Sequence, residues 1–383
     1  MRCIVTILLF LISACWGIKA DDNIKKDNKV RHTMAIVDSI LKVKKPTFKE
    51  RMKTRFNMVN SELDAQQPTT DTQYVTRPPQ PWTIKIRYDA KRSYYSTDDV
   101  YEGQRYNYYF DNELNSTIGL NVNYRGFSIA LSLNPKKVLG RNNDTEFNLN
   151  YYNNKFGADF TYSNMKRFHY SNNWFDLKTG KDDVLGNTKL ASYSANFYYV
   201  FNNRKFSYPA AFTHSWIQKR SAGSFIAGTS LYYGKINVDL DAFDLEKATK
   251  LQYMVDDLTM KYVSLNFGYA YNYVPSKHWL LHASFTPGLM LWKDYEASIV
   301  KFKIEENFEE NKESVDYEPY AVERLPKRFL DWTGIIRIGA TYSWQKYFLG
   351  ATFVKQFDNI GDENIATIYG SRWKIRAYFG VRL

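Results

Sequence analysis

Hydrophobic and polar residues alternate along most of the chain from residue 82 onward. The pattern is clearest over residues 118–133, which read IGLNVNYRGFSIALSL and are interrupted only at Arg125-Gly126. Successive side chains of a strand point to opposite faces, so each half of this segment has one apolar face and one polar or small face. A two-residue link that contains glycine favours a tight turn, and the segment therefore predicts an antiparallel hairpin.

The same arrangement recurs and predicts hairpins with short turns near residues 125, 153, 203, 234, 276 and 345. Residues 193–201 are expected to pair with residues 206–212, and residues 225–231 with residues 236–240 across Gly234. The first strand begins at Trp82 and the last ends at Leu383. These segments predict about fourteen strands, or twelve if the hairpin at Gly234 lies outside the wall.

The composition of the two faces favours a membrane wall over the core of a soluble sandwich. The apolar face repeatedly carries aromatic residues near the strand ends, in a chain with 31 Tyr, 25 Phe and 9 Trp, and the other face carries Asn, Ser, Thr, Lys and Arg. After residue 20 no apolar run is long enough for a transmembrane helix. Short turns that alternate with longer polar loops are typical of outer-membrane barrels. We therefore expect an all-β, antiparallel transmembrane β-barrel, surrounded by the outer-membrane lipid of a Gram-negative bacterium, with both termini periplasmic.

Residues 1–20 are typical of a secretory signal peptide, with a charge at Arg2 and an apolar segment over residues 4–12. The tetrapeptide that ends at Cys15 resembles a bacterial lipobox, so lipidation of Cys15 is the alternative to cleavage after residue 20. Cys3 and Cys15 are both inside this segment, and the exported chain is therefore expected to have no disulfide.

Residues 21–81 are expected to form a separate periplasmic region before the barrel domain of residues 82–383. Helical spacing predicts two short basic amphipathic helices over residues 30–41 and 47–59, followed by a Pro-bearing linker. Such helices can lie on a membrane surface, or they can pack against the periplasmic mouth of the barrel. Residues 21–80 are therefore a candidate contact for a periplasmic partner.

The chain is basic, with 52 Lys and Arg against 40 Asp and Glu and a formal net charge of +12. This balance favours anionic lipid head groups, anionic solutes or nucleic acid as partners. Export argues against nucleic acid. An excess of surface lysine is the alternative that needs no specific partner.

Two resemblances refine this interpretation. The last strand resembles the assembly signal of outer-membrane barrels, because Phe379, Val381 and Leu383 alternate to the end of the chain, although Leu stands where an aromatic residue is usual. This resemblance implies contact with the barrel assembly machinery. The segment DTQYVTRPPQPW over residues 71–82, followed by a strand and the NYRGFSIALSLNP hairpin, resembles a domain-of-unknown-function family (DUF4421-like) of exported Bacteroidota proteins. It implies an outer-membrane barrel and brings no activity, substrate or catalytic residue.

The first candidate site is a group of cations that we call the basic seam. Closing a barrel makes its first and last strands neighbours, which would bring together inward-facing side chains of both. The seam comprises Lys85, Arg87, Arg372, Lys374, Arg376 and Arg382. It would attract anions into the lumen. Alternatively, its members pair with interior carboxylates such as Asp89 and Asp159, because an unpaired charge in a narrow lumen is costly.

The second candidate is an acidic segment in the longest outer loop. It comprises Glu305, Glu306, Glu309, Glu310, Glu313, Asp316 and Glu318. One interpretation is a gate that folds inward onto the basic seam. The other is an ordinary solvated loop.

His282 and Ser284 share one strand face, as a base and a nucleophile require. Their spacing is similar to that of outer-membrane lipid A deacylases, which also need a carboxylate partner that the sequence does not place. We expect no enzyme and no catalytic residue. The histidines have no metal-ligand spacing, so no metal or cofactor is expected.

The sequence thus favours a channel or transporter-like barrel for small solutes, anionic ones included. One alternative is a closed structural or binding barrel that acts through its outer loops and periplasmic helices. A more remote alternative is a lipid-modifying enzyme.

Overall fold

The structure is a computed structural model of the chain. It describes residues 70–101, 104–135, 145–172, 184–239, 253–307, 312–324, 330–362 and 366–383, together with Thr54, Asn57 and Ser61, which are helical. Backbone contacts divide the chain into Met1–Gln67 and Pro68–Leu383. The expected signal peptide with Cys15, the helix over residues 30–41 and most of the helix over residues 47–59 lie outside the described residues.

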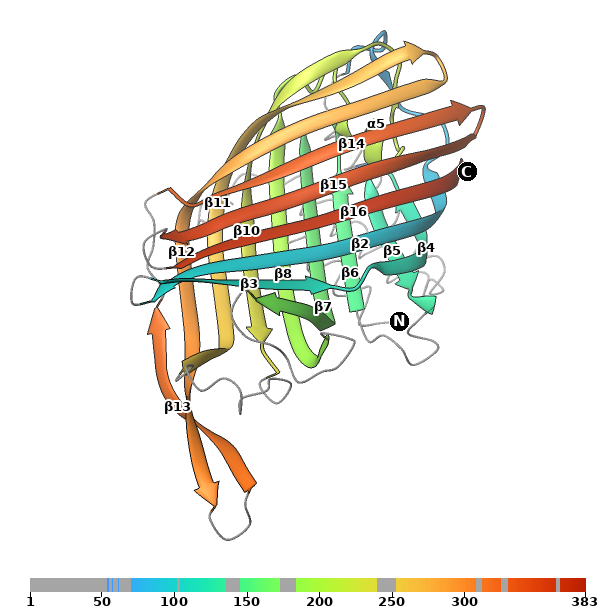
Figure 1. The fold of residues 1–383 in the computed structure, drawn as a ribbon. Coiled ribbons are helices and arrows are strands. Elements are labelled where there is room, and N and C mark those ends of the chain that lie inside the picture. Colours follow the sequence, from blue (N-terminus) through green and yellow to red (C-terminus); the bar gives the residue numbers. More distant parts are fainter. Residues whose placement is uncertain are drawn as a thin grey trace, which may run out of the picture. The chain divides into compact units, whose positions relative to one another are not determined.

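The described part of Pro68–Leu383 is a barrel of antiparallel strands (Figure 1). Twelve strands close the wall. They are β2 (Trp82–Tyr101), β4 (Asn115–Tyr124), β5 (Phe127–Leu133), β6 (Thr145–Tyr152), β7 (Phe156–Asn172), β8 (Val184–Val200), β10 (Ala222–Asn237), β11 (Tyr253–Ser276), β12 (Trp279–Asn307), β14 (Trp332–Trp344), β15 (Tyr347–Asp362) and β16 (Ala366–Arg382). β2 and β16 pair from Thr83 opposite Arg382 to Asp99 opposite Ala366, and this pairing closes the ring. The predicted antiparallel barrel is confirmed.

Two further strands extend the sheet beyond the ring. β3 (Gln104–Asn112) pairs with the outer half of β2 and with the end of β7. β13 (Lys312–Arg324) pairs with the end of β12, and Figure 1 shows this pair as a ribbon that leads away from the barrel. With these two strands, the sheet in the described part of the chain has fourteen strands.

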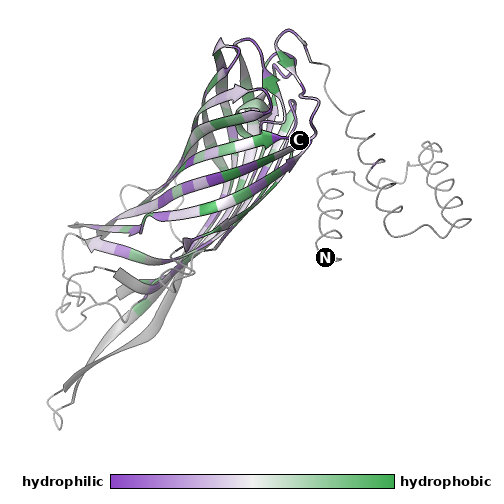
Figure 2. Cartoon of the chain, turned by 90° about the vertical axis from the view of Figure 1, so that its right-hand side faces the viewer, coloured by the Kyte–Doolittle hydropathy of each residue, from purple (hydrophilic) through white to green (hydrophobic). Residues whose placement is uncertain are grey.

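The two faces of the wall differ as the alternation predicts. Along β2, Ile86 and Tyr88 are 61% and 49% exposed, whereas Lys85 and Arg87 are 5% and 4% exposed. Figure 2 shows hydrophilic and hydrophobic residues alternating along the strands. Apolar side chains cover the outside and polar side chains line the inside, as in a wall between lipid and a polar lumen.

The predicted strand over residues 206–212 is wrong, because Tyr208–Phe212 forms the short helix α5. Ser207 caps this helix by accepting a hydrogen bond from the Ala210 amide, and Pro209 lies in the first turn, where its missing N–H leaves no bond unmade. The loop from β8 to β10, residues 201–221, carries α5 into the lumen. We call this loop the plug.

The predicted turn at Gly234 is also wrong. β10 continues through Gly234 and pairs with β8 on one side and with β11 on the other. A Cβ at this position would meet the Tyr232 hydroxyl at 2.6 Å, so the glycine makes room for a ring inside the lumen. The strand over residues 206–212 is thus absent, and the two strands predicted on either side of Gly234 are one. The fourteen predicted strands therefore become the twelve that close the barrel.

The end of the expected linker packs against the plug. β1 (Val75–Thr76) pairs with β9 (Ile217–Gln218), which belongs to the plug. Val75 is fully buried and packs with Ala210 and Trp216. Among the described residues, no helix combines the length and the apolar character needed to cross a membrane.

Candidate functional site: the lumen of the barrel

Two cations of the basic seam hold the plug in the lumen. Lys85 Nζ donates to the Phe212 carbonyl at 2.7 Å, and Arg382 Nε donates to the His214 carbonyl at 3.2 Å. The His214 ring stacks on Phe348 with centroids 4.3 Å apart. The carbonyl of Phe212, the last residue of α5, lacks a partner within the helix, and Lys85 supplies one. The plug is therefore attached to β2, β15 and β16.

Farther from the short turns, the lumen contains a layer of buried ion pairs. The Asp89 carboxylate accepts from Arg376 Nε at 2.7 Å and lies 3.3 Å from Arg87 Nη2. We call this layer the ionic layer and define it as Arg87, Asp89, Lys91, Glu146, Asp159, Arg337, Asp358, Arg372, Lys374 and Arg376. It holds six cations and four carboxylates, a surplus of two positive charges.

The other carboxylates of the ionic layer join strands that lie apart in the wall. Glu146 on β6 contacts both Lys91 on β2 and Lys374 on β16. Asp159 on β7 lies 3.7 Å from Arg337 on β14. Each of these contacts crosses the lumen or spans several strands, so the ionic layer links opposite parts of the wall.

The ionic layer ends at a buried carboxylate with mixed partners. Asp358 lies 2.5 Å from Arg372 and accepts hydrogen bonds from Tyr262 and Thr333, each at 2.8 Å. Arg372 also lies over the Tyr232 ring, with its guanidinium carbon 4.7 Å from the ring centroid. A carboxylate that accepts several hydrogen bonds is better compensated for its burial than one in a single ion pair.

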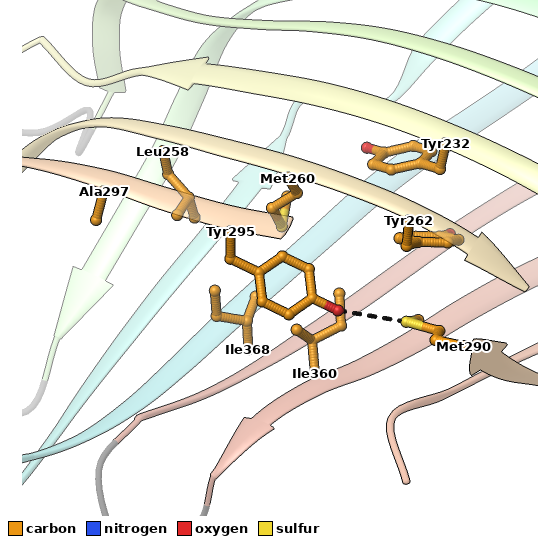
Figure 3. Packing of buried hydrophobic residues seen from close by; sticks show 9 residues of the cluster. All are labelled: Tyr232, Leu258, Met260, Tyr262, Met290, Tyr295, Ala297, Ile360 and Ile368. Carbon is orange, nitrogen blue, oxygen red and sulfur yellow. Dashed lines mark hydrogen bonds between the residues drawn. The ribbon is translucent and has the colours of Figure 1, made fainter. Parts of the chain in front are cut away.

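An apolar cluster of buried side chains lies inside the barrel beyond the ionic layer (Figure 3). It consists of Tyr232, Leu258, Met260, Tyr262, Met290, Tyr295, Ala297, Ile360 and Ile368. Tyr295 donates a hydrogen bond to Met290 Sδ at 3.4 Å. The plug, the ionic layer and this cluster occupy successive levels of the barrel interior.

All six residues of the basic seam lie on β2 and β16 and point into the lumen. Four of them, Arg87, Arg372, Lys374 and Arg376, pair with carboxylates. The expected pairing with Asp89 occurs, whereas Asp159 contacts Arg337, which the sequence analysis did not single out. Arg337 occupies an inward-facing position of β14. The alternation of inward and outward positions along that strand was the sequence signal that could have identified it.

The acidic segment is only partly described, because Glu309 and Glu310 lie outside the described residues. In the described backbone, Glu305 stands opposite Ser314 and Glu306 opposite Glu313 in the ribbon of β12 and β13. Figure 1 shows this ribbon leading away from the barrel. The described backbone of the segment therefore lies outside the lumen.

His282 and Ser284 meet inside the lumen. His282 Nε2 lies 3.2 Å from Ser284 Oγ, and Nδ1 lies 2.7 Å from Asn272 Oδ1. The sequence analysis missed Asn272, which stands directly opposite His282 on β11. The plug covers this chain of hydrogen bonds with Tyr208 and Phe212, whose ring centroids lie 5.4 and 4.9 Å from the imidazole. Within the described residues, no group of three or more His, Cys, Asp or Glu could hold a metal ion.

A cavity of about 150 Å³ adjoins the ionic layer. It is lined by Asp89, Lys91, Asn115, Thr117, Ser132, Leu133, Asn134, Thr145, Glu146 and Lys374. These residues come from β2, β4, β6 and β16 and from the end of β5. The cavity therefore reaches from the charged lumen to the wall.

The strands form a closed antiparallel ring with an apolar exterior and a charged interior. This architecture defines a β-barrel of the outer-membrane class. The chain belongs to the family described as "Domain of unknown function (DUF4421)", whose model matches residues 69–383. The family resemblance found in the sequence is thus confirmed. A search of curated proteins found no match.

Several solved outer-membrane proteins are similar to the chain at low identity. The outer membrane protein OprG from Pseudomonas aeruginosa is 12% identical over 79% of this chain and 96% of its own, with a TM-score of 0.26. The translocator domain of the autotransporter NalP from Neisseria meningitidis is 10% identical over 88% and 96%, with a TM-score of 0.28. The Pseudomonas putida toluene transporter TodX is 7% identical over 80% and 90%, with a TM-score of 0.24. TM-scores this low carry no argument about function.

Proposed function

We propose that this chain is an outer-membrane transport barrel, closed at rest, that admits small anionic solutes when the plug leaves the lumen. The observation that carries the proposal is the surplus of cations among the described residues of the ionic layer and the basic seam. The ionic layer has six cations against four carboxylates, and Lys85 and Arg382 add two more beside the plug. A field of one sign in a low-dielectric channel raises the local concentration of ions of the opposite sign.

Stability alone does not account for this charged interior. Buried ion pairs are often no more stabilising than apolar side chains of similar volume, because desolvation offsets their attraction. Apolar side chains such as those of the cluster around Tyr262 would occupy the level of the ionic layer equally well. The charged interior is therefore better explained by a solute that must pass it.

The proposal extends to how the chain reaches its membrane. Residues 1–20 act as the export signal, and the assembly machinery recognises the last strand through Phe379, Val381 and Leu383. The outward-facing side chains at the end of the chain support recognition by the assembly machinery, because Phe379 on β16 is 49% exposed and Leu383, which follows β16, is 50% exposed.

The test is conductance in planar bilayers with the full mature chain and with a variant in which residues 206–216 are replaced by a short Gly-Ser link. We expect the first to be closed and the second to conduct, with a reversal potential that favours chloride over potassium. In the variant without the plug, Lys374→Gln together with Arg376→Gln should reduce this anion preference. Lys355→Gln, at an outward-facing position of β15, should not reduce it. A folded variant without the plug that never conducts, or that prefers cations, would overturn the proposal.

The filled lumen favours a second candidate, a closed barrel that binds partners through its outer loops and residues 21–80. This candidate predicts that the variant without the plug stays closed. It also predicts that deletion of residues 21–80 removes periplasmic partners from affinity-purified material.

A further inference from the structure

The connections between strands at one end of the barrel carry positive charge and no carboxylate side chain. They are residues 125–126, 153–155, 201–221, 277–278 and 345–346, all of which the structure describes. They contain eight Lys and Arg, four of them in the plug, and no Asp or Glu. Short connections lie on the periplasmic side of outer-membrane barrels, so this end presents cations to the periplasmic leaflet of the membrane.

Two of these cations lie over aromatic rings that face the lipid. Lys346 Nζ is 5.4 Å from the ring centroid of Tyr347, and Lys155 Nζ is 5.5 Å from that of Phe156. Phe156 is 48% exposed, and Tyr347 occupies an outward position because the next residue, Phe348, is fully buried inside the barrel. Both lysines are therefore on the lipid side of the wall and not over its mouth.

At one place an aromatic surface joins two of the lysines. The rings belong to β12, β14 and β15, and their successive centroids are 5.2, 5.7 and 6.0 Å apart. We call this surface the aromatic patch and define it as Trp279, Tyr342, Trp344 and Tyr347. Lys277 stands two positions before the first ring in the sequence, and Lys346 lies over the last. Trp and Tyr are enriched where a membrane wall meets the head groups, which places both lysines at head-group level.

The turns that carry the two lysines are bonded to each other. The Ser343 amide donates to the His278 carbonyl at 2.8 Å, and His278 Nδ1 lies 2.9 Å from the Ser343 carbonyl. The side chains of Lys277 and Lys346 are exposed, and neither forms an ion pair within the described part of the chain. Two positive charges thus stand beside an apolar surface without a counter-ion there.

The chain offers no nearby acidic segment to neutralise these lysines. Residues 21–69 contain more Lys and Arg than Asp and Glu. The acidic segment begins at the far end of β12, in the ribbon with β13. By contrast, Lys235 on the outside of β10, toward the outer end of the barrel, pairs with Asp257 at 2.8 Å. A counter-ion for Lys277 and Lys346 must therefore come from another molecule.

We propose that Lys277, Lys346 and the aromatic patch bind an anionic phospholipid of the periplasmic leaflet, with a head group of the phosphatidylglycerol type. The phosphodiester lies between the two ammonium groups, and the glycerol ester region lies on the rings, which accept an apolar and a polar neighbour together. A zwitterionic head group binds less well, because its own ammonium group repels the lysines. This inference does not depend on the transport function.

Quenching of tryptophan fluorescence by lipids with brominated acyl chains tests the head-group preference of the purified full chain in mixed vesicles. The signal is the part of the fluorescence that Trp279→Phe removes, so it reports on this site. A lysine near an anionic membrane surface contributes about 5-fold, and we expect phosphatidylglycerol to be preferred over phosphatidylcholine about 5- to 25-fold. Lys277→Gln with Lys346→Gln should abolish the preference, whereas Lys277→Arg with Lys346→Arg should keep it.

Lys235→Gln is the matched control, because it removes a lysine from the outside of the wall where Asp257 already supplies the counter-charge. It should leave the lipid preference unchanged. An unchanged preference in the double glutamine variant, or an equal loss in Lys235→Gln, would overturn the proposal. An excess of inorganic phosphate or of a soluble glutamate-rich peptide should not displace the lipid. Displacement by phosphate would show a site for the free ion, displacement by the peptide would show a protein-docking surface, and either result contradicts a lipid site.

Discussion

Replacement of Asp89 by Asn is expected to destabilise the barrel far more than the loss of one surface charge would. The Asp89 side chain is 5% exposed and lies within 3.3 Å of two guanidinium groups, those of Arg87 and Arg376. The asparagine side chain keeps the shape of the aspartate and removes its charge, which leaves the buried Arg87 and the half-buried Arg376 without their shared counter-ion. Removing one partner of a buried ion pair costs about 3–5 kcal/mol, because the remaining charge stays desolvated.

The chain offers a matched control for this change. Asp111 pairs with Arg92 on the outside of the wall, where the Asp111 and Arg92 side chains are 21% and 47% exposed. Exposed ion pairs contribute about 0–1 kcal/mol, so Asp111→Asn should have a correspondingly small effect. The sequence change is the same in both variants, whereas the burial of the carboxylate and the number of its cationic partners differ.

The measurement is equilibrium unfolding by guanidinium chloride in phospholipid vesicles, followed by tryptophan fluorescence. The midpoint for Asp89→Asn should fall well below that for Asp111→Asn, with the slope of the transition unchanged. Adding Arg376→Met to Asp89→Asn should recover part of the lost stability, because it removes one of the two stranded charges. If the two single variants unfold at the same denaturant concentration, the ionic layer is hydrated and the argument from desolvation is wrong.

Three further outcomes are expected. Lys85→Met removes the donor to the Phe212 carbonyl and should raise the frequency of brief openings in bilayer recordings, whereas Lys85→Arg should not. Gly126→Ala places a Cβ against the Tyr152 carbonyl at a φ of +102° and should destabilise the barrel by about 1–3 kcal/mol, seen as a lower temperature for the loss of the fast-migrating folded band on gels. Ser284 should remain unlabelled by a fluorophosphonate probe even in the variant without the plug; labelling that requires His282 would instead support the lipid-modifying enzyme.

The regular part of the wall could be predicted from the sequence because lipid outside and polar groups inside impose a strict period of two. The hairpin at Arg125-Gly126 is the clearest case: its predicted strands pair in the structure from Tyr124 opposite Phe127 to Ile118 opposite Leu133. The neighbourhood of β2 and β16 follows from closure alone, and it brings the basic seam together. Local alternation and ring closure are therefore sufficient to predict the wall of the barrel and the position of the basic seam.

The plug could not be predicted from the same rule. Phe206, Tyr208 and Phe212 repeat the alternation of a strand, yet they pack inside the lumen, where a short helix and its flanks also bury aromatic rings. The local signal was Ser207 followed by Pro209, which favours a helix start over a strand. At Gly234 the error was the reverse, a turn predicted within a continuous strand. A glycine that makes space for an aromatic ring cannot be told from a turn glycine in the sequence.

The partners within the lumen also depend on long-range geometry. No spacing in the sequence relates Asn272 to His282 or Arg337 to Asp159, because these pairs arise from strand register and from the curvature of the wall.

The closure of the ring by β2 and β16 has a consequence for biogenesis. Asp89 and Arg376 touch across this closure although they are 287 positions apart in the chain. Contacts of such sequence separation form late, because a very long loop must first be brought together. Until β16 has paired with β2, the first strand keeps an unpaired edge, so the exported chain must be shielded from other chains until the ring closes in the membrane.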